Sequence, residues 1–306
     1  MAQPLLEAPP RLADEHQAQQ AALVSLIPAL LRQAWPLLDL HDLKATMPAF
    51  TAAVRSIVQK YGRASAAGAL DYYRHERQAA SVLGRPSLKL APSPADAVIE
   101  QAVSWATTDL YGPITPEAET NALARLDGAA QRLVLDQGRD TIIDAVRHDR
   151  TAKGWARVTS PGACSFCIML ALRAGDGFLY TSRESGNFRA HTPDGKHGGG
   201  LCQCGVTPVF TAYEPPARMR EMAALWKDST KGRSGKDARN AFRQAVEGRP
   251  VTGTTGKPTA KPKVTIGKSS MDRAQAQFLL DQAKGLPDSP WRTGQIARLS
   301  KLLAGK

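Results

Sequence analysis

All four cysteines of this chain lie between residues 164 and 204, as two closely spaced pairs. Cys164 and Cys167 stand in GACSFCIML, and Cys202 and Cys204 stand in GLCQCGV. The surrounding sequence, residues 151–213, is glycine-rich and too short to bury much apolar surface, and small modules of this kind usually need a cross-link to fold. The cysteine spacing therefore constrains this part of the fold more than any other feature of the sequence.

Zinc binding is our first interpretation of this pattern. A structural zinc site takes four thiolate or imidazole ligands, usually supplied as close pairs. The candidate ligands are Cys164, Cys167, Cys202 and Cys204. His191 and His197 lie between the two pairs and are alternative ligands for one position. Two other interpretations stay open, namely a redox-labile disulfide pair and four inert buried thiols.

The sequence also predicts where the chain is made. It contains no uncharged apolar stretch of about 18 residues, which a membrane-spanning helix would need, and its start shows no basic segment followed by an apolar one. We therefore expect no membrane contact and synthesis in a reducing cytoplasm. Paired cysteines bind metal there more often than they form structural disulfides.

Residues 1–150 predict an all-helical N-terminal domain. Apolar residues recur with the i, i+3, i+4 spacing of an amphipathic helix in residues 19–38, where Pro28 is expected to kink or end the helix. The same spacing returns in residues 48–61, and Gly62 is the expected stop of that helix.

Two further helix starts follow from capping residues. Ser93 is followed by Pro94, and Thr115 is followed by Pro116 and two glutamates, both typical of the first turn of a helix. The stretch that begins at Thr115 is the longest helical signal in the chain. We expect the histidines of this domain on the surface or at helix ends; they are His16, His41, His75 and His148.

The character of the sequence changes at residue 151. Residues 177–181 (GFLYT) and 205–210 (GVTPVF) are expected to form short strands, so residues 151–213 predict a small α+β module. Residues 214–249 predict a basic helical extension, and residues 250–306 a basic linker with short C-terminal helices. The expected fold class is mainly α with a small α+β module.

The net charge of +12 is concentrated at the C-terminal end. Residues 1–150 carry a net charge of −2, residues 151–213 of +3 and residues 214–306 of +11. A basic region of this kind favours a polyanionic partner, most simply nucleic acid, although a solvated tail would look the same. The candidate DNA-binding residues are Lys231, Arg233, Lys236, Arg239, Arg243, Lys257, Lys261, Lys263 and Lys268.

We find no motif that predicts a catalytic centre. No cysteine stands apart from the two pairs as a protease nucleophile would, and no Gly-x-Ser-x-Gly turn frames a serine. Ser165, His191 and Asp194 are residue types that a serine protease uses, and the loop histidines leave a metal-dependent nuclease open. We therefore predict no catalytic residues.

Residues 155–210 resemble the module of the phage Mu F-like (MuF-type) minor capsid and head morphogenesis proteins of actinobacterial tailed phages. The motif consists of an Arg-Val, the two cysteine pairs, an aromatic residue between them and a Val-x-Pro-Val end. The matching positions are Arg157, Val158, Ala163, Cys164, Cys167, Leu170, Ala171, Tyr180, His191, Cys202, Cys204, Pro208 and Val209. The family's histidine lies close to the Cys-x-Cys, and both His191 and His197 are candidates for it.

This resemblance implies a structural minor capsid protein that acts in head morphogenesis. It would be made in the cytoplasm of the bacterial host and reside in the virion, inside the capsid near the portal vertex. Its expected partners are the portal protein, the capsid or scaffold proteins, and packaged DNA. The alternative function is a capsid maturation protease or a metal-dependent nuclease of the phage head.

Overall fold

The computed structural model describes residues 12–113, 115–159, 163–186 and 204–251, together with Ile296 and Ser300. The chain divides into two compact units, Met1–Thr255 and Gly256–Lys306, and the elements below belong to the first. None of the helices in the described ranges is both long enough and apolar enough to cross a membrane.

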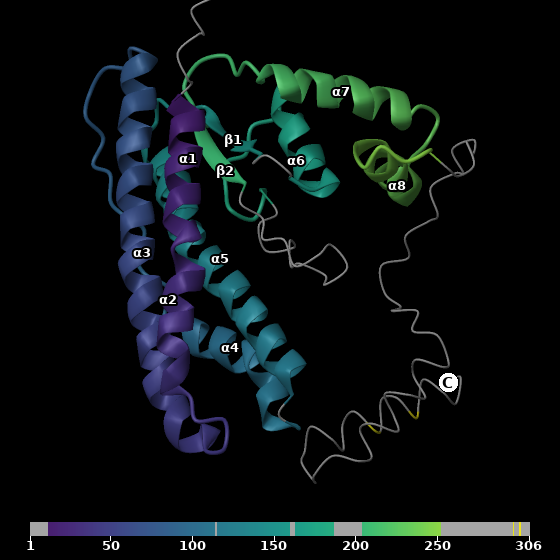
Figure 1. Cartoon of the computed structure of the whole chain (residues 1–306). Coiled ribbons are helices and arrows are strands. Elements are labelled where there is room, and N and C mark those ends of the chain that lie inside the picture. The colour runs from purple at the N-terminus through teal and green to yellow at the C-terminus, as the bar shows by residue number, and fades with distance from the viewer. Residues whose placement is uncertain are drawn as a thin grey trace, which may run out of the picture. The chain divides into compact units, whose positions relative to one another are not determined.

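A helical bundle forms the N-terminal half of the first unit (Figure 1). Its α-helices are α1 (Leu12–Ser25), α2 (Ile27–Ala34), α3 (Leu43–Ala79), α4 (Asp96–Ala106) and α5 (Pro116–His148). Two short 3-10 helices, η1 (Trp35–Leu37) and η2 (Thr108–Tyr111), complete it. Every regular element described before residue 150 is thus helical, as predicted. Their apolar faces enclose one core that contains Leu31, Phe50, Val58, Ile99 and Leu126.

The start of α5 follows the predicted capping chemistry. The Thr115 hydroxyl accepts a hydrogen bond of 3.2 Å from the Ala118 backbone N–H, and Pro116 occupies the first turn. The predicted cap at Ser93 is wrong by two residues, because the residue before α4 is Ala95 and the helix begins at Asp96 without a side-chain cap. Pro28 stands at the start of α2, immediately after the break that separates α2 from α1.

The predicted helix stop at Gly62 is also wrong, because α3 continues through it to Ala79. Gly62 instead lies where α5 approaches α3. A Cβ atom at this position would stand 2.2 Å from the Oε1 atom of Gln137. The same close approach recurs at Gly138 of α5, where a Cβ atom would stand 2.4 Å from the Ser65 hydroxyl oxygen. Both glycines therefore permit helix contact rather than chain reversal.

A two-stranded antiparallel sheet follows the bundle. Strand β1 (Gly154–Val158) pairs with β2 (Gly205–Val209), with Trp155 opposite Pro208 and Arg157 opposite Val206. The predicted strand at residues 205–210 is confirmed. The one predicted at residues 177–181 is wrong, since only Tyr180 pairs, as an isolated bridge to Trp155. The strand β1 has no alternating pattern, because four of its five residues are buried.

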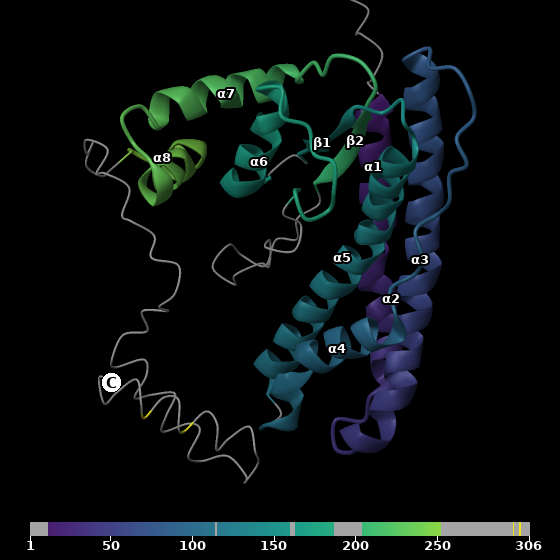
Figure 2. The ribbon, with the colours of Figure 1, turned by 180° about the vertical axis from the view of Figure 1, so that it is seen from behind.

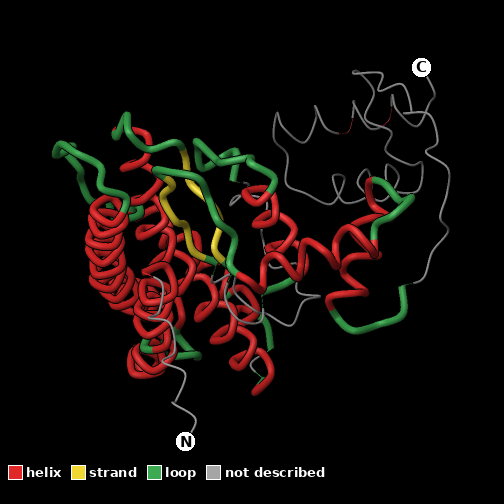
Figure 3. Tube along the Cα trace, turned by 90° about the horizontal axis from the view of Figure 1, so that it is seen from above, coloured by secondary structure: helices red, strands yellow, loops and turns green. Residues whose placement is uncertain are grey.

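Three shorter helices lie on the other side of the sheet from the bundle (Figures 2 and 3). They are α6 (Ser165–Gly175), α7 (Ala217–Ser229) and α8 (Gly235–Val246). Ile168 and Ala171 of α6 share an apolar cluster with Met219 of α7 and Phe242 of α8. The mainly α fold with a small α+β module is thereby confirmed.

A buried ion pair ties the ends of α3 and α5 together. The Arg77 Nε atom lies 2.9 Å from an Asp149 carboxylate oxygen, and the remaining Arg77 nitrogens donate to three consecutive backbone carbonyls, those of residues 82–84. Asp149 also accepts from Tyr73 and Thr151. Burial raises the pKa of Asp149, but the hydrogen bonds outweigh this effect and hold the pKa below its usual value.

His16 differs from the prediction of a surface or helix-end histidine. It lies inside α1 and is buried, with its ring stacked on that of Tyr72 at a centroid distance of 4.4 Å. The Tyr72 hydroxyl in turn shares a hydrogen bond of 2.6 Å with the Thr207 hydroxyl. The stacked rings and this hydrogen bond together connect α1, α3 and β2. His41, His75 and His148 are exposed, as expected.

Candidate functional site in the cysteine module

The first cysteine pair stands at the start of α6. Cys164 is the residue before the helix, and its carbonyl accepts the first intrahelical hydrogen bond, from Ile168 N–H at 3.0 Å. Cys167 follows one turn later and is buried, whereas Cys164 is half-buried. The spacing of three places both sulfur atoms on the same side of the first helical turn.

Cys204 is the described member of the second pair, and it is held through its backbone. This residue directly precedes β2 and is buried, and its carbonyl accepts a hydrogen bond of 2.8 Å from the Arg139 Nε atom of α5. Arg139 also pairs with Asp136 at 2.8 Å, and Asp136 pairs with Arg183 at 3.0 Å. Arg183 bonds Asp140 as well. The long helix α5 thus anchors both Cys204 and the turn that contains Arg183.

Arg157 is a buried arginine of the module itself, and it reaches Cys167 of the first cysteine pair. The side chain is 1% exposed although it projects from a strand of only five residues. One guanidinium nitrogen donates to the Cys167 sulfur at 3.9 Å, and another donates to the Gly186 carbonyl at 2.6 Å. Sequence reasoning gave Arg157 no role beyond its place in the Arg-Val motif and missed Arg139 altogether. An arginine in a short segment rich in cysteine and glycine is the signal available for Arg157, whereas Arg139 lies in ordinary helical sequence.

Two aromatic residues fill the centre of the module. The rings of Trp155 and Tyr180 are stacked at 4.7 Å, and both side chains are fully buried. Burial raises the pKa of Tyr180, which keeps its hydroxyl protonated, and that hydroxyl donates to the Leu170 carbonyl of α6 at 2.7 Å. The strand β1 and the helix α6 are thereby fixed relative to each other.

The predicted metal ligands are only partly within the described residues. Cys164, Cys167 and Cys204 are described, whereas Cys202, His191 and His197 lie outside the described ranges. Within those ranges, no group of three or more His, Cys, Asp or Glu side chains is arranged to hold a metal ion. Zinc binding therefore stays a prediction.

The predicted DNA-binding residues divide in the same way. Lys231 and Arg233 lie in the turn between α7 and α8, and Lys236, Arg239 and Arg243 lie in α8. The remaining four are outside the described ranges; they are Lys257, Lys261, Lys263 and Lys268. In α8 the spacing of three and four residues places the basic side chains along one side of the helix.

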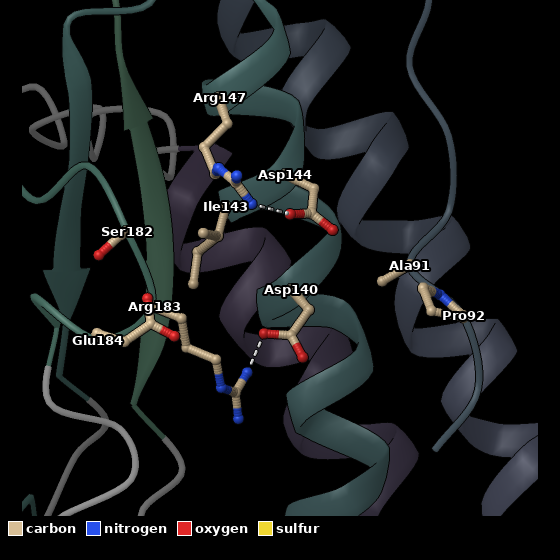
Figure 4. A pocket seen from close by; sticks show the side chains of 9 residues that line it. All are labelled: Ala91, Pro92, Asp140, Ile143, Asp144, Arg147, Ser182, Arg183 and Glu184. Carbon is tan, nitrogen blue, oxygen red and sulfur yellow. Dashed lines mark hydrogen bonds and ion pairs between the residues drawn. The ribbon is translucent and has the colours of Figure 1, made fainter. Parts of the chain in front are cut away.

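A cavity of about 500 Å³ lies between α5, the loop before α4 and the turn at residues 182–184 (Figure 4). Two ion pairs stand in its wall, between Arg147 and Asp144 at 3.5 Å and between Arg183 and Asp140. Since each arginine already has a carboxylate partner, neither offers an unmatched charge to an anion. We therefore interpret this cavity as a gap in the packing between the bundle and the module and not as a ligand site.

Comparison with known families gives one match. A family model described as VG15 protein matches residues 7–229, which include the bundle, the cysteine module and α7 but not α8. Comparison of the chain with curated proteins and with solved structures found no match. Because the family model covers well over half of the sequence, the chain belongs to the VG15 protein family, and this membership indicates a phage protein.

Proposed function

We propose that the chain is a structural minor capsid protein of a tailed phage and acts in head morphogenesis. The main support for this proposal is that a single family model matches both the helical bundle and the cysteine module, which are in contact in the structure. The match runs through the helical bundle and the cysteine module, and Arg139 of the bundle bonds Cys204 of the module. The motif at residues 157–209 supports the narrower assignment to the MuF-type proteins of actinobacterial phages.

The proposed place of action is the interior of the capsid near the portal vertex. Exposed aromatic side chains support a protein partner there, since Trp105 of α4 is 57% exposed and Tyr111 of η2 is 63% exposed. Arg125 lies over the Trp105 ring. Tryptophan, tyrosine and arginine are the residues that contribute most to protein–protein interfaces. The partner to which we assign this surface is the portal protein, with capsid or scaffold proteins as the other contacts.

Purified heads test this assignment. Heads assembled in a host cell that produces the wild-type chain should contain it, and cross-linking followed by mass spectrometry should join it to the portal protein. The double substitution of Trp105 and Tyr111 by alanine should reduce its incorporation. A matched control is Leu83→Ala, because Leu83 is 89% exposed and lies in the loop after α3. A chain that is absent from purified heads would refute the proposal.

We also propose that the four cysteines bind one structural zinc ion. Cys164 and Cys167 present two sulfur atoms from one helical turn, and pairing of β1 with β2 brings Cys204 to the same module. Structural zinc supplies folding free energy of order 10 kcal/mol in small modules. Cys164→Ser should therefore unfold the module and leave the bundle helical, as followed by far-UV circular dichroism. Wild-type protein purified without chelator should carry about one zinc per chain, and metal-free protein would contradict this.

The proposed contact with packaged DNA is made by the hairpin of α7 and α8 and the basic residues that follow it. Trp226 and Phe242 pack edge to face at 4.9 Å and hold the two helices together. Lys236 and Arg239 are exposed side chains of α8. Lysine and arginine that bind phosphate give sequence-independent, salt-dependent affinity.

A charge-reversal pair tests the DNA contact. Changing Lys236 and Arg239 to glutamate should lower the affinity for duplex DNA and reduce the dependence on salt by about one unit of the log–log slope per lysine or arginine. The matched control makes the same charge change at Lys60 and Arg63, which are exposed on α3. If both double variants bind DNA with the same affinity, α8 does not contact the DNA. Fluorescence anisotropy at several salt concentrations provides the measurement.

The alternative hydrolytic function is tested by co-expression with the major capsid protein. Of the histidines that the structure describes, His148 bonds a backbone carbonyl, His16 stacks on Tyr72, and none is hydrogen-bonded to a serine or cysteine. Cleavage of the capsid protein that disappears on His191→Ala or His197→Ala would establish an enzyme. Intact capsid protein, with head assembly still dependent on the cysteines, supports the structural function.

A further inference from the structure

Helix α4 and the following η2 expose three large apolar or aromatic side chains. They are Val98, Trp105 and Tyr111. A spacing of seven residues places Val98 and Trp105 on the same side of α4, and Gln101 lies between them on that side. Residues 101–108 contain no charged side chain. Exposed apolar groups gathered in this way are typical of an interaction surface.

The same part of the chain is acidic. Residues 90–124, which include α4, η2 and the first turns of α5, contain no lysine or arginine, although the whole chain has a net charge of +12. Arg55 of α3 lies 2.7 Å from a Glu100 carboxylate oxygen, and Arg125 of α5 lies 2.9 Å from one of Asp109. The carboxylates of the stretch outnumber these two arginines, so this part of a basic protein carries excess negative charge. They belong to Asp96, Glu100, Asp109, Glu117 and Glu119.

The chemistry of this surface favours a protein partner over DNA. Carboxylates repel phosphate groups, whereas they attract the lysine and arginine side chains of a protein. Exposed aromatic side chains pair with an apolar surface that removes them from water. The row of Val98, Gln101 and Trp105 runs along α4 and matches the row that an amphipathic helix presents on its apolar side. Helix α4 lies in the half of the bundle away from the sheet (Figures 1 and 2), which separates this surface from the cysteine module.

We propose that α4 and η2 form a docking surface for a basic amphipathic helix of a partner protein. The apolar side chains of that helix cover Val98, Trp105 and Tyr111, and its lysine or arginine side chains face Glu100 and Glu117. This inference rests on the portal contact proposed above and states the chemistry of the partner. Opposite charges across an interface speed up association and select the partner, whereas buried aromatic groups supply most of the affinity.

The test uses the full chain and two synthetic helical peptides. Both peptides carry the same stripe of leucine and alanine, and one has lysine where the other has glutamate. Trp105 reports on the site, because the emission of an exposed tryptophan shifts to shorter wavelength when the ring is covered. The Trp105→Phe variant shows which part of the change in emission comes from this residue. Affinity is measured separately, by fluorescence anisotropy of labelled peptide at several salt concentrations.

The lysine peptide should shift the Trp105 emission, and the glutamate peptide should not. This preference opposes the net charge of +12, which by itself would attract the glutamate peptide. The double substitution Glu100→Gln and Glu117→Gln should weaken binding of the lysine peptide roughly 2- to 30-fold at low salt, the range expected for two surface ion pairs. The difference from the wild type should shrink as the salt concentration rises.

The matched control is Asp71→Asn with Glu221→Gln, which removes two exposed carboxylates from α3 and α7. Asp71 pairs with Arg74 as Glu100 pairs with Arg55. The two double variants therefore have the same net charge, and each weakens a surface ion pair. The control should bind the lysine peptide as tightly as the wild type does.

The same effect of both peptides on the Trp105 emission would overturn the proposal, and so would wild-type affinity in the variant with Glu100→Gln and Glu117→Gln. An equal loss of affinity in the control would also overturn it, because the total charge and not α4 would then attract the peptide. A shift of Trp105 emission on adding duplex DNA, or on concentrating the chain alone, would assign the surface to DNA or to a second copy instead. None of these results depends on whether heads contain the chain, which decides the function proposed above.

Discussion

The buried histidine of α1 allows a quantitative test of how that helix is held against the bundle. Burial lowers the pKa of His16 from its usual 6.5 to about 4, against a smaller opposing effect of a hydrogen bond with Gln19. The unfolded chain therefore binds a proton at His16 near pH 6.5, and the folded protein binds it only near pH 4. The contribution of His16 to stability is complete above pH 6.5 and is lost progressively as the pH falls toward 4.

The magnitude follows from the two pKa values. Linkage predicts that His16 removes roughly 2 kcal/mol of unfolding free energy between about pH 7.5 and about pH 5. The substitution His16→Phe keeps an aromatic ring against Tyr72 but cannot take up a proton. The variant should therefore lack this loss. At about pH 5 the wild type should have lost roughly 2 kcal/mol more than His16→Phe, relative to the values at about pH 7.5.

The assay is urea unfolding followed by far-UV circular dichroism at both pH values. His75→Gln provides the control, because His75 lies on the exposed side of α3 and its loss should leave the pH dependence unchanged. Burial also raises the pKa of Glu76. Its titration is common to all three proteins and cancels in the comparison. If the wild type and His16→Phe lose the same unfolding free energy on acidification, the reasoning is refuted, because the pH dependence would then arise from groups other than His16.

Two further substitutions test the contacts that join the helices. Arg77→Met should lower the free energy of unfolding by about 3 kcal/mol or more in urea unfolding, because it leaves the Asp149 carboxylate buried without its cation. A change below about 1 kcal/mol would show that water replaces the guanidinium. Gly138→Ala should cost about 1–3 kcal/mol by thermal unfolding despite the higher helix propensity of alanine, because its Cβ atom would meet the Ser65 hydroxyl oxygen at 2.4 Å. An unchanged melting temperature would mean that α3 and α5 separate without cost.

The helices of the bundle could be predicted because their signals are local. The cap at Thr115 and the break before Pro28 depend on residues within one turn, and the structure shows both. Gly62 was misassigned because its role is set by Gln137, which belongs to another helix. Periodicity within α3 carries no information on how closely α5 approaches. His16 was misassigned for the same reason, since its burial depends on Tyr72 of α3.

The cysteine module was less predictable for a physical reason. Strand β1 is covered on both faces, so its residues do not alternate between apolar and polar, and it contains a buried arginine. The pattern that identifies a half-exposed strand is therefore missing. Arg139 and Arg157 also bond groups far from them in the sequence, the Cys204 carbonyl and the Cys167 sulfur respectively. Such pairs leave no periodic trace in a sequence.

The pairing of β1 with β2 has a consequence for the order of events during synthesis. Residues 159–204 separate the two strands, so β1 leaves the ribosome on the order of seconds before its partner does. The face of α5 that later receives β2, which includes Ile142 and Val146, is already complete at that time. A nascent chain therefore carries an open apolar surface and an unpaired strand until β2 arrives. Chaperone binding is expected to be strongest on chains that have passed Val158 but have not reached Val209.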